Sequence, residues 1–319
     1  MRERDVIERL RRIATHPAAR RLEDDAALLD GFVLTHDSIA ESVHFFPDDP
    51  PSSVGWKLVA VNLSDLAAKG ARPVAALLSL TLSGDDAWDL AFIDGVEAAC
   101  ESYSVALIGG DTIRLPELAP RVLGLTAIGR AGERTPSRSG GSPGDRLWVA
   151  GFVGDSAAGL ALLTEDPKAV GVLVDVFRRP VPLLEMGEAL APAANAIMDV
   201  SDGLLLDLQR LCAASGCGAE VELDLLPLSR AFIAERGQDR AARLFAASGG
   251  DDYALLAALP GDVQPAVTLS LPKKPTLACI GKLVPGSALA LTHGGKAVPL
   301  PEPLGYEHRT EHPPMGDRR

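Results

Sequence analysis

The sequence lacks the features of secreted, membrane-spanning and zinc-binding proteins. Its four cysteines form neither a C-x-x-C pair nor a zinc-ligand spacing, so we expect reduced thiols. No apolar run approaches the ~18 residues of a membrane span, which predicts no membrane partner. The N-terminal segment MRERDVIERLRR has no apolar signal core, and its acidic residues are atypical of a transit peptide. We therefore expect a cytoplasmic protein.

A basic surface is also missing. The chain has 31 Lys and Arg residues against 43 Asp and Glu residues, a net charge of −12. Because nucleic-acid backbones attract clustered Lys and Arg, we expect no nucleic-acid partner. The apolar share of 47% is typical of globular proteins, and 319 residues is about twice the length of a typical domain.

The common catalytic signatures are absent as well. The sequence contains no G-x-x-x-x-G-K-[ST] loop, no kinase H-R-D or D-F-G element and no H-E-x-x-H. If the protein acts on a nucleotide, its site is therefore of another kind.

A composition break divides the chain into two parts. The segment GERTPSRSGGSPG, at residues 132–144, is rich in Gly, Ser and Pro, as linkers are. Strand and helix patterns alternate on both sides of it, which predicts an α/β (α+β) protein with two lobes. We expect an N-terminal domain over 1–132, a linker over 133–144, a C-terminal α/β domain over 145–310 and a disordered tail over 311–319.

Three predicted elements carry polar residues of interest. A helix over 56–69, ended by Gly70, places Asn62, Asp65 and Lys69 within about 60° of one another, which is either a functional stripe or a solvated face. A strand over 105–108 is expected to deliver residues 109–112 into a loop. A strand over 196–200 is expected to lead into a helix from about 201 to 215.

Aspartates recur at the ends of apolar segments. They are Asp24, Asp25, Asp37, Asp65, Asp111, Asp199, Asp202, Asp251 and Asp252. Taken singly, each of these residues can be a turn or helix-capping residue. Brought together, the carboxylates would repel one another, and magnesium, which prefers carboxylate and phosphate oxygens, removes that repulsion. An EF-hand is rejected for the run from Asp199, because its glycine falls at the fifth position and Arg210 at the twelfth.

The chain resembles the thiamine-monophosphate kinase family, of the superfamily that includes aminoimidazole ribonucleotide synthetase. The matching segments follow the family's order and cover most of the chain. They are THDSIAESVHF (35–45), VNLSDLAAKGARP (61–73), LIGGDT (107–112), GDSAAGLALL (154–163), MDVSDGLLLDL (198–208), SGGDDYAL (248–255) and GYEH (305–308).

The resemblance implies a fold, a site and residue roles. The N-terminal lobe would contribute a β-barrel across a homodimer, and the site between the lobes would hold several Mg²⁺ ions with ATP as co-substrate. The implied magnesium ligands are Asp25, Thr35, Asp37, Asp65, Asp111, Asp199 and Asp202. The implied ATP contacts are Gly110, Asp111, Arg138 and Ser201, and the implied thiamine-phosphate contacts are His44, Asp251 and Tyr306.

Three positions differ from the family's usual pattern. Arg21-Leu22-Glu23 precede the first Asp-Asp where glycines are usual, His36 replaces a small hydroxyl residue, and Asp251 replaces a glutamate.

The expected activity is transfer of the γ-phosphoryl group of ATP to thiamine monophosphate by direct in-line displacement. The acceptor is a phosphate oxygen that is already largely deprotonated at neutral pH, so no catalytic base is needed. The thiazolium cation could pack against Tyr306, Phe45 or Phe46. The alternatives are an ATP-dependent enzyme of the same superfamily with another small acceptor, and a non-catalytic Mg-nucleotide-binding module.

Overall fold

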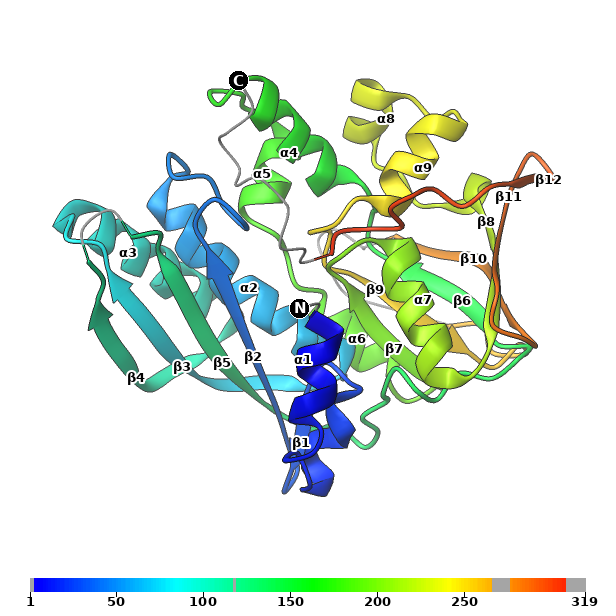
Figure 1. The fold of residues 1–319 in the computed structure, drawn as a ribbon, viewed down its shortest axis with the longest axis horizontal. Helices are drawn as coiled ribbons and strands as arrows, with labels where there is room; N and C mark the ends of the chain where they lie inside the picture. The colour runs from blue at the N-terminus through cyan, green and yellow to red at the C-terminus, as the bar shows by residue number, and fades with distance from the viewer. Residues whose placement is uncertain (1–2, 117–118, 266–275, 308–319) are drawn as a thin grey trace.

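Two mixed α/β lobes lie side by side in the computed structural model, which describes residues 3–116, 119–265 and 276–307 (Figure 1). Each lobe is built around its own sheet, so the predicted two-lobed α/β class is confirmed. The predicted tail at 311–319 lies outside the described residues. No helix in the described ranges is both long and apolar enough to cross a membrane.

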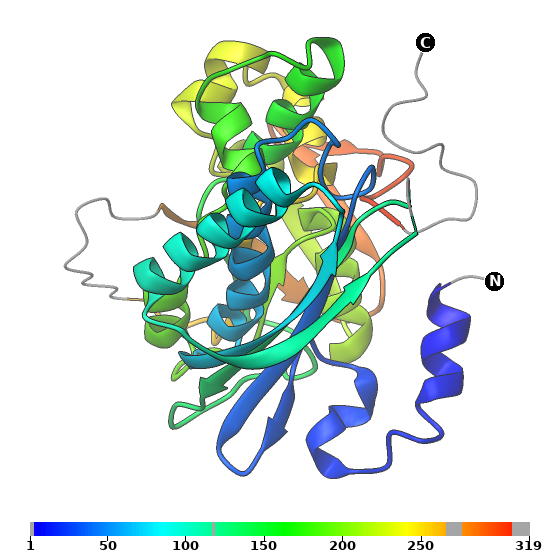
Figure 2. The same cartoon turned by 90° about the vertical axis from the view of Figure 1, so that its left-hand side faces the viewer.

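The N-terminal lobe is a five-stranded sheet covered on one face by two long helices. The strand order is β1 (Ala27–Leu29), β2 (Phe32–Ala40), β5 (Val122–Arg130), β3 (Arg72–Leu82) and β4 (Ala106–Arg114). The helices are α2 (Pro51–Ala68) and α3 (Asp86–Tyr103), and α1 (Glu3–Leu10) and the 3₁₀ helix η1 (Pro17–Leu22) precede the sheet. Figure 2 shows α2 and α3 running side by side. They approach closely because each helix has a glycine at the contact, Gly55 on α2 and Gly95 on α3. A Cβ on Gly55 would lie 2.1 Å from the carbonyl oxygen of Phe92.

The glycine pair after the predicted strand at 105–108 does not begin a loop, so that part of the prediction is wrong. Strand β4 continues through Gly109 and Gly110 to Arg114 and pairs in parallel with β3. A Cβ on Gly110 would lie 1.9 Å from the carbonyl oxygen of Leu78, so the glycine here serves close strand packing. Within the described chain this sheet stays open, with β4 as its exposed edge.

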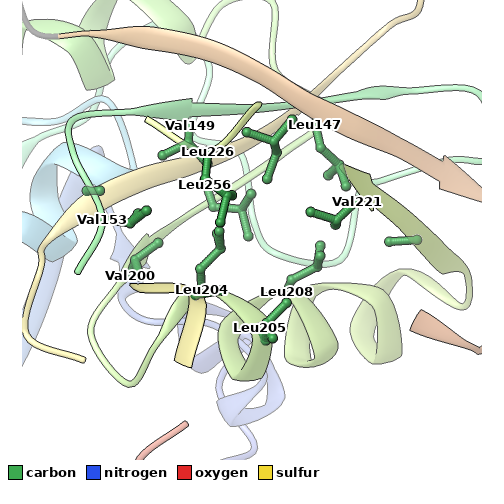
Figure 3. Close-up of a cluster of buried hydrophobic side chains, with 14 of the residues drawn as sticks. Leu147, Val149, Val153, Val200, Leu204, Leu205, Leu208, Val221, Leu226 and Leu256 are labelled. Atoms are coloured by element: carbon green, nitrogen blue, oxygen red, sulfur yellow. The ribbon is translucent and has the colours of Figure 1, made fainter. Parts of the chain in front are cut away.

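The C-terminal lobe is a seven-stranded mixed sheet with helices on both faces. Its strand order is β12 (Lys296–Val298), β11 (Leu289–His293), β8 (Gly218–Glu222), β10 (Leu277–Val284), β6 (Arg146–Ala150), β9 (Ala254–Leu259) and β7 (Ala196–Val200). Its helices are α4 (Asp155–Glu165), α5 (Val172–Arg178), α6 (Leu184–Leu190), α7 (Leu204–Ser215), the 3₁₀ turn η2 (Leu223–Leu225), α8 (Arg230–Arg236) and α9 (Arg240–Ser248). Figure 3 shows Leu204 and Leu208 of α7 packed against Val149 and Leu256 of the sheet.

The end of α2 joins the two lobes. Ala67 and Ala68 pack in one apolar cluster with Met186 of α6 and Ile197 of β7, on the sheet face opposite α7. Since α2 is covered by α3, by its own sheet and by the second lobe, almost the whole helix is buried. Packing at this junction places the C-terminal half of α2 beside β7.

The Gly- and Ser-rich segment at 133–144 crosses between the lobes without forming a helix or a strand. It contacts both of them: the carbonyl oxygen of Thr135 accepts a hydrogen bond from Arg20, and the Gly141 N–H donates to Ser215 Oγ. The segment is therefore held in place, although its composition is that of a linker.

Candidate functional site

Three carboxylates from three different elements meet at the junction of the lobes. Asp25 precedes β1, Asp65 lies on α2 and Asp199 lies on β7, and one oxygen of each is within 4.8 Å of the others. Hard carboxylate oxygens at this separation are ligands suited to Mg²⁺. The residues present therefore fit the magnesium site that the sequence predicts.

Burial and mutual repulsion make this cluster unfavourable without a cation. Burial raises the pKa of Asp65 well above its usual range, and the nearby Asp37 and Asp199 raise it further. Burial and the charge of Asp25 raise the pKa of Asp199 to about 8, despite a 2.7 Å hydrogen bond from Ser64 Oγ. Carboxylates with raised pKa values are stabilised by a bound cation, because it favours their ionised form.

Basic side chains occupy all four carboxylate oxygens of the Asp24-Asp25 pair. Lys69 Nζ lies 2.5 Å from Asp24 Oδ1 and 2.8 Å from Asp25 Oδ2. Arg20 bonds Asp24 Oδ2, and Arg138 bonds Asp25 Oδ1. Burial alone would raise the pKa of Asp25, but Lys69 and Arg138 outweigh it and hold that pKa well below its usual range.

The strand β2 supplies two further predicted ligands beside the cluster. Thr35 Oγ1 donates a hydrogen bond to Asp65 Oδ2, and the Asp37 N–H donates to Asn62 Oδ1 at 2.8 Å. Removal from bulk water and the charge of Asp25 raise the pKa of Asp37. Asn62 and Asp65 are thus buried and bonded, so the solvated-face interpretation of the α2 stripe is wrong.

A tight loop between β7 and α7 presents Ser201 and Asp202. The buried Asp207 carboxylate accepts hydrogen bonds from both of their N–H groups, at 3.1 and 3.0 Å, and Arg210 Nη1 lies 2.5 Å from Asp202 Oδ2. Burial and the charge of Asp202 raise the pKa of Asp207 to about 7. Helix α7 has Gly203 as its N-cap, so Ser201 and Asp202 do not cap it.

A cleft of about 1250 Å³ opens beside the acidic cluster, between elements of both lobes. Its walls include six of the predicted site residues. They are Asp37, His44, Ser201, Asp202, Asp251 and Tyr306. Metal-ligand, ATP-contact and substrate-contact candidates that are far apart in the sequence therefore face one cavity.

A second buried lysine organises the other part of this cleft. Lys57 Nζ of α2 lies 3.0 Å from Asp251 Oδ2 and 3.0 Å from the carbonyl oxygen of His44. The Tyr253 hydroxyl donates to Asp251 Oδ1 at 2.8 Å, so both oxygens of that carboxylate are engaged. Lys57 also packs over the ring of Phe177, 3.9 Å from its centroid.

The two phenylalanines considered for the thiazolium ring differ in position. Phe46 lines the cleft and packs edge-on against Phe177, with ring centroids 6.2 Å apart. Phe45 is buried in the core of the N-terminal lobe, so the interpretation of Phe45 as a cleft residue is wrong. Tyr306 lies at the cleft wall, where its N–H donates to the carbonyl oxygen of Asp202 at 2.8 Å.

Gly110 and Asp111 are not brought to the cluster within one chain. Asp111 is aligned across the sheet with Ser79 of β3, then Gly124 of β5, then Ser38 next to Asp37. Three strand spacings of about 4.8 Å place Asp111 about 14 Å from that end of β2. Their expected contact with metal and ATP stays a prediction that requires a second copy of the chain.

Sequence reasoning missed Lys57 and the anchoring role of Asp207 and Asp252. Asp252, next to Asp251, accepts hydrogen bonds from the N–H groups of Gly154 and Ser156 at the start of α4. A lysine inside the apolar run GWKLVAV, at residues 55–61, was the available signal for Lys57. For Asp207 the sequence carried no such signal, because the groups that it anchors are the backbone N–H groups of Ser201 and Asp202.

Comparison with known proteins connects this arrangement to a family. The AIR synthase related protein family matches over residues 23–131 with its N-terminal domain and over residues 142–294 with its C-terminal domain. The thiamine-monophosphate kinase of Escherichia coli (strain K12) is 38% identical over 299 residues, which cover 89% of this chain and 90% of that protein.

Two solved structures share the fold over almost the whole chain. A structure described as AaThiL complexed with AMPPCP and TMP matches with a TM-score of 0.82 and 30% identity, covering 97% of both chains. The thiamine-monophosphate kinase of Stenotrophomonas maltophilia K279a matches with a TM-score of 0.74 and 35% identity, covering 92% of this chain and 96% of that one. Because sequence and fold agree over both lobes, the chain belongs to the thiamine-monophosphate kinase family, within the AIR synthase related proteins.

Proposed function

We propose that this protein transfers the γ-phosphoryl group of ATP to thiamine monophosphate, forming thiamine diphosphate. The observation that carries the proposal is the cleft between the lobes, which adjoins a buried carboxylate cluster and is lined by the substrate-contact candidates. The relatives named thiamine-monophosphate kinase, and the related structure described with AMPPCP and TMP, support this choice of substrates. The cytoplasmic location stays a prediction from the sequence.

Magnesium would be held first by Asp25, Asp65 and Asp199, whose oxygens already converge. Bound Mg²⁺ would neutralise the phosphate oxygens of both substrates and align them for displacement. Asp37 and Asp202 face the cleft next to the cluster and would supply further carboxylate ligands for magnesium. Thr35 would hold Asp65 in place through its hydroxyl hydrogen bond.

The protein's own groups then have binding and positioning tasks rather than proton transfer. A phosphomonoester with a second pKa of ~6 is mostly dianionic at neutral pH, so the acceptor oxygen needs no base. Arg138 and Ser201 are the proposed ATP contacts. Among the described residues, the buried Arg138 Nε has no hydrogen-bond partner, which leaves a donor for a phosphate oxygen.

His44, Asp251 and Tyr306 are proposed to hold thiamine monophosphate at the other side of the cleft. The aromatic faces of Phe46 and Tyr306 suit a thiazolium cation. Because Lys57 already neutralises Asp251, we propose that this carboxylate accepts a hydrogen bond from the substrate rather than forming an ion pair with the thiazolium ring.

A homodimer built on the N-terminal sheet belongs to the same proposal. Strand β4 is exposed along its whole length, and Ile108, which is 61% exposed, projects from it with Leu107 and Ile113. An apolar edge strand without a partner is a surface suited to pairing with a second copy. In such a dimer Gly110 and Asp111 would reach the active site of the partner.

The direct test is to incubate the protein with ATP, MgCl₂ and thiamine monophosphate and to identify the product by mass spectrometry. We expect thiamine diphosphate and ADP in equal amounts. ADP release that depends on another acceptor would indicate a different enzyme of the superfamily, and Mg-ATP binding without turnover would indicate a binding module.

The proposed single displacement makes a separate stereochemical prediction. With a chiral γ-phosphoryl group, one in-line transfer inverts the configuration at phosphorus, and no label from ATP should remain on the protein without acceptor. Retention of configuration would contradict direct transfer, because retention requires two displacements.

A further inference from the structure

The acidic cluster contains a lysine, Lys69, to which the proposed function gives no role. Its side chain is 0% exposed, and its ammonium group has an acceptor for each of its three N–H bonds. These acceptors are Asp24 Oδ1 at 2.5 Å, Asp25 Oδ2 at 2.8 Å and the carbonyl oxygen of Ile197 at 3.3 Å. Three oxygen atoms thus surround the ammonium group, as oxygen ligands surround a bound metal ion.

The position of Lys69 in the fold prevents it from leaving. It follows the last turn of α2, where Ala67 and Ala68 are buried against the second lobe. Withdrawing the ammonium group would leave two nearly buried carboxylates, Asp24 and Asp25, without this partner. Breaking a buried ion pair in this way is strongly unfavourable, so we expect the contact to persist when ligands bind.

The other cation on Asp25 can exchange more easily. Arg138 bonds Asp25 Oδ1 from the segment at 133–144, and its side chain remains 21% exposed. A metal ion bound by Asp25 would therefore replace Arg138 on Oδ1, while Oδ2 stays on Lys69. Arg138 would then be released toward the phosphates of ATP.

We propose that the Lys69 ammonium group is a permanent cation of this site, which reserves Asp24 and one oxygen of Asp25 and so takes the place of one Mg²⁺ ion. The inference rests on the proposed function, because it assumes that the neighbouring carboxylates bind magnesium. The prediction that follows is that removing this charge creates a new magnesium position between Asp24 and Asp25.

The test compares Lys69→Met with Lys57→Met, which removes another fully buried lysine, at the substrate part of the cleft. Magnesium bound per chain is measured by equilibrium dialysis with Mg²⁺ alone, without nucleotide or thiamine monophosphate. We expect Lys69→Met to bind one more Mg²⁺ per chain than the wild type, and Lys57→Met to bind the same number as the wild type.

Thermal unfolding gives a second readout that does not depend on activity. In EDTA, Lys69→Met should unfold about 6–10 °C below the wild type, because a buried ion pair is broken. Saturating Mg²⁺ should restore most of that loss, since a ligand that binds only the folded state stabilises it. Lys57→Met should lose stability that Mg²⁺ does not restore.

The double variant Asp24→Asn/Lys69→Met keeps the test decisive if the single variant does not fold. Removing one acid together with the lysine restores the charge balance, so this variant should fold in EDTA and bind as many Mg²⁺ ions as the wild type. Failure of the double variant to fold, an extra Mg²⁺ bound to it, or an unchanged magnesium count in Lys69→Met would overturn the inference. A wild type that binds no Mg²⁺ would instead contradict the metal site of the proposed function.

Discussion

Asp65 is the side chain on which the acidic cluster depends most directly. Burial raises the pKa of Asp65, and the charges of Asp37 and Asp199 raise it further. We predict that Asp65→Asn lowers kcat by about 100-fold or more, because an amide binds Mg²⁺ poorly and metal positioning is lost. Steady-state kinetics at saturating Mg²⁺ checks this, with Asp89→Asn on α3 as a buried acid outside the cleft. Unchanged turnover in Asp65→Asn would remove Asp65 from the site.

His44 is expected to contribute to binding more than to the chemical step. Its Nδ1 accepts a 3.0 Å hydrogen bond from the Ala40 N–H, which orients the ring at the cleft wall. We predict that His44→Ala raises the KM for thiamine monophosphate by a larger factor than it lowers kcat. His293→Ala, in strand β11 of the second lobe, serves as the control and should change neither parameter. A drop in kcat with an unchanged KM would contradict the assignment.

Backbone conformation explains one departure from the family's pattern. Arg20, Arg21 and Leu22 have φ values of +44°, +60° and +53°, the left-handed region in which glycine is not strained. The chain thus keeps the loop conformation that glycine favours while using other residues. Arg20, which directly precedes the departing residues, forms an ion pair with Asp24.

At the scale of elements, a single buried carboxylate binds both N–H groups of the loop between β7 and α7. Asp207 accepts two backbone hydrogen bonds from Ser201 and Asp202 and pairs with Arg210 at 2.8 Å. We predict that Asp207→Ala lowers the free energy of unfolding by about 2–4 kcal/mol and kcat/KM by at least about 10-fold, because Ser201 and Asp202 lose their anchor.

Chemical denaturation and kinetics on the same preparation check the effect of Asp207. The control is Asp239→Ala, which removes the N-cap hydrogen bond of α9 and should cost about 1 kcal/mol of stability without a change in kcat/KM. Full activity in Asp207→Ala would show that the loop is held by other contacts.

At the scale of the whole molecule, the question is whether a single chain forms a complete active site. The exposed edge of the first sheet, strand β4, is the surface on which the answer depends. We predict that Ile108→Asp on β4 gives a monomer with activity at least about 10-fold lower, because a charge at the proposed interface blocks pairing and removes Asp111 from the partner's site. Light scattering and kinetics test this together. Val170→Asp is the matched control, since Val170 is also an exposed apolar residue but lies in the second lobe. A fully active wild-type monomer would contradict the dimer.

The sequence by itself determined the family, the two-lobed α/β class and six site residues that face the cleft. Motifs are local, so a segment such as MDVSDGLLLDL identifies Asp199 and Asp202 without any knowledge of the fold. The domain limits at 132 and 145 remain predictions of the same kind. The prediction of a loop at Gly109 and Gly110 was wrong because glycine was interpreted as a turn signal. In the fold these glycines allow close packing of β4 against β3.

Only the tertiary structure decided which charges meet. The distance between Asp25, Asp65 and Asp199 depends on how α2 packs between the two lobes, and no local pattern encodes that packing. The same packing buries Lys69 against Asp24 and Asp25, whereas the sheet register places Asp111 about 14 Å from Ser38 of β2. The energy of a buried charge is set by its neighbours in space, so the role of each ionisable residue follows from the fold rather than from its position in the sequence.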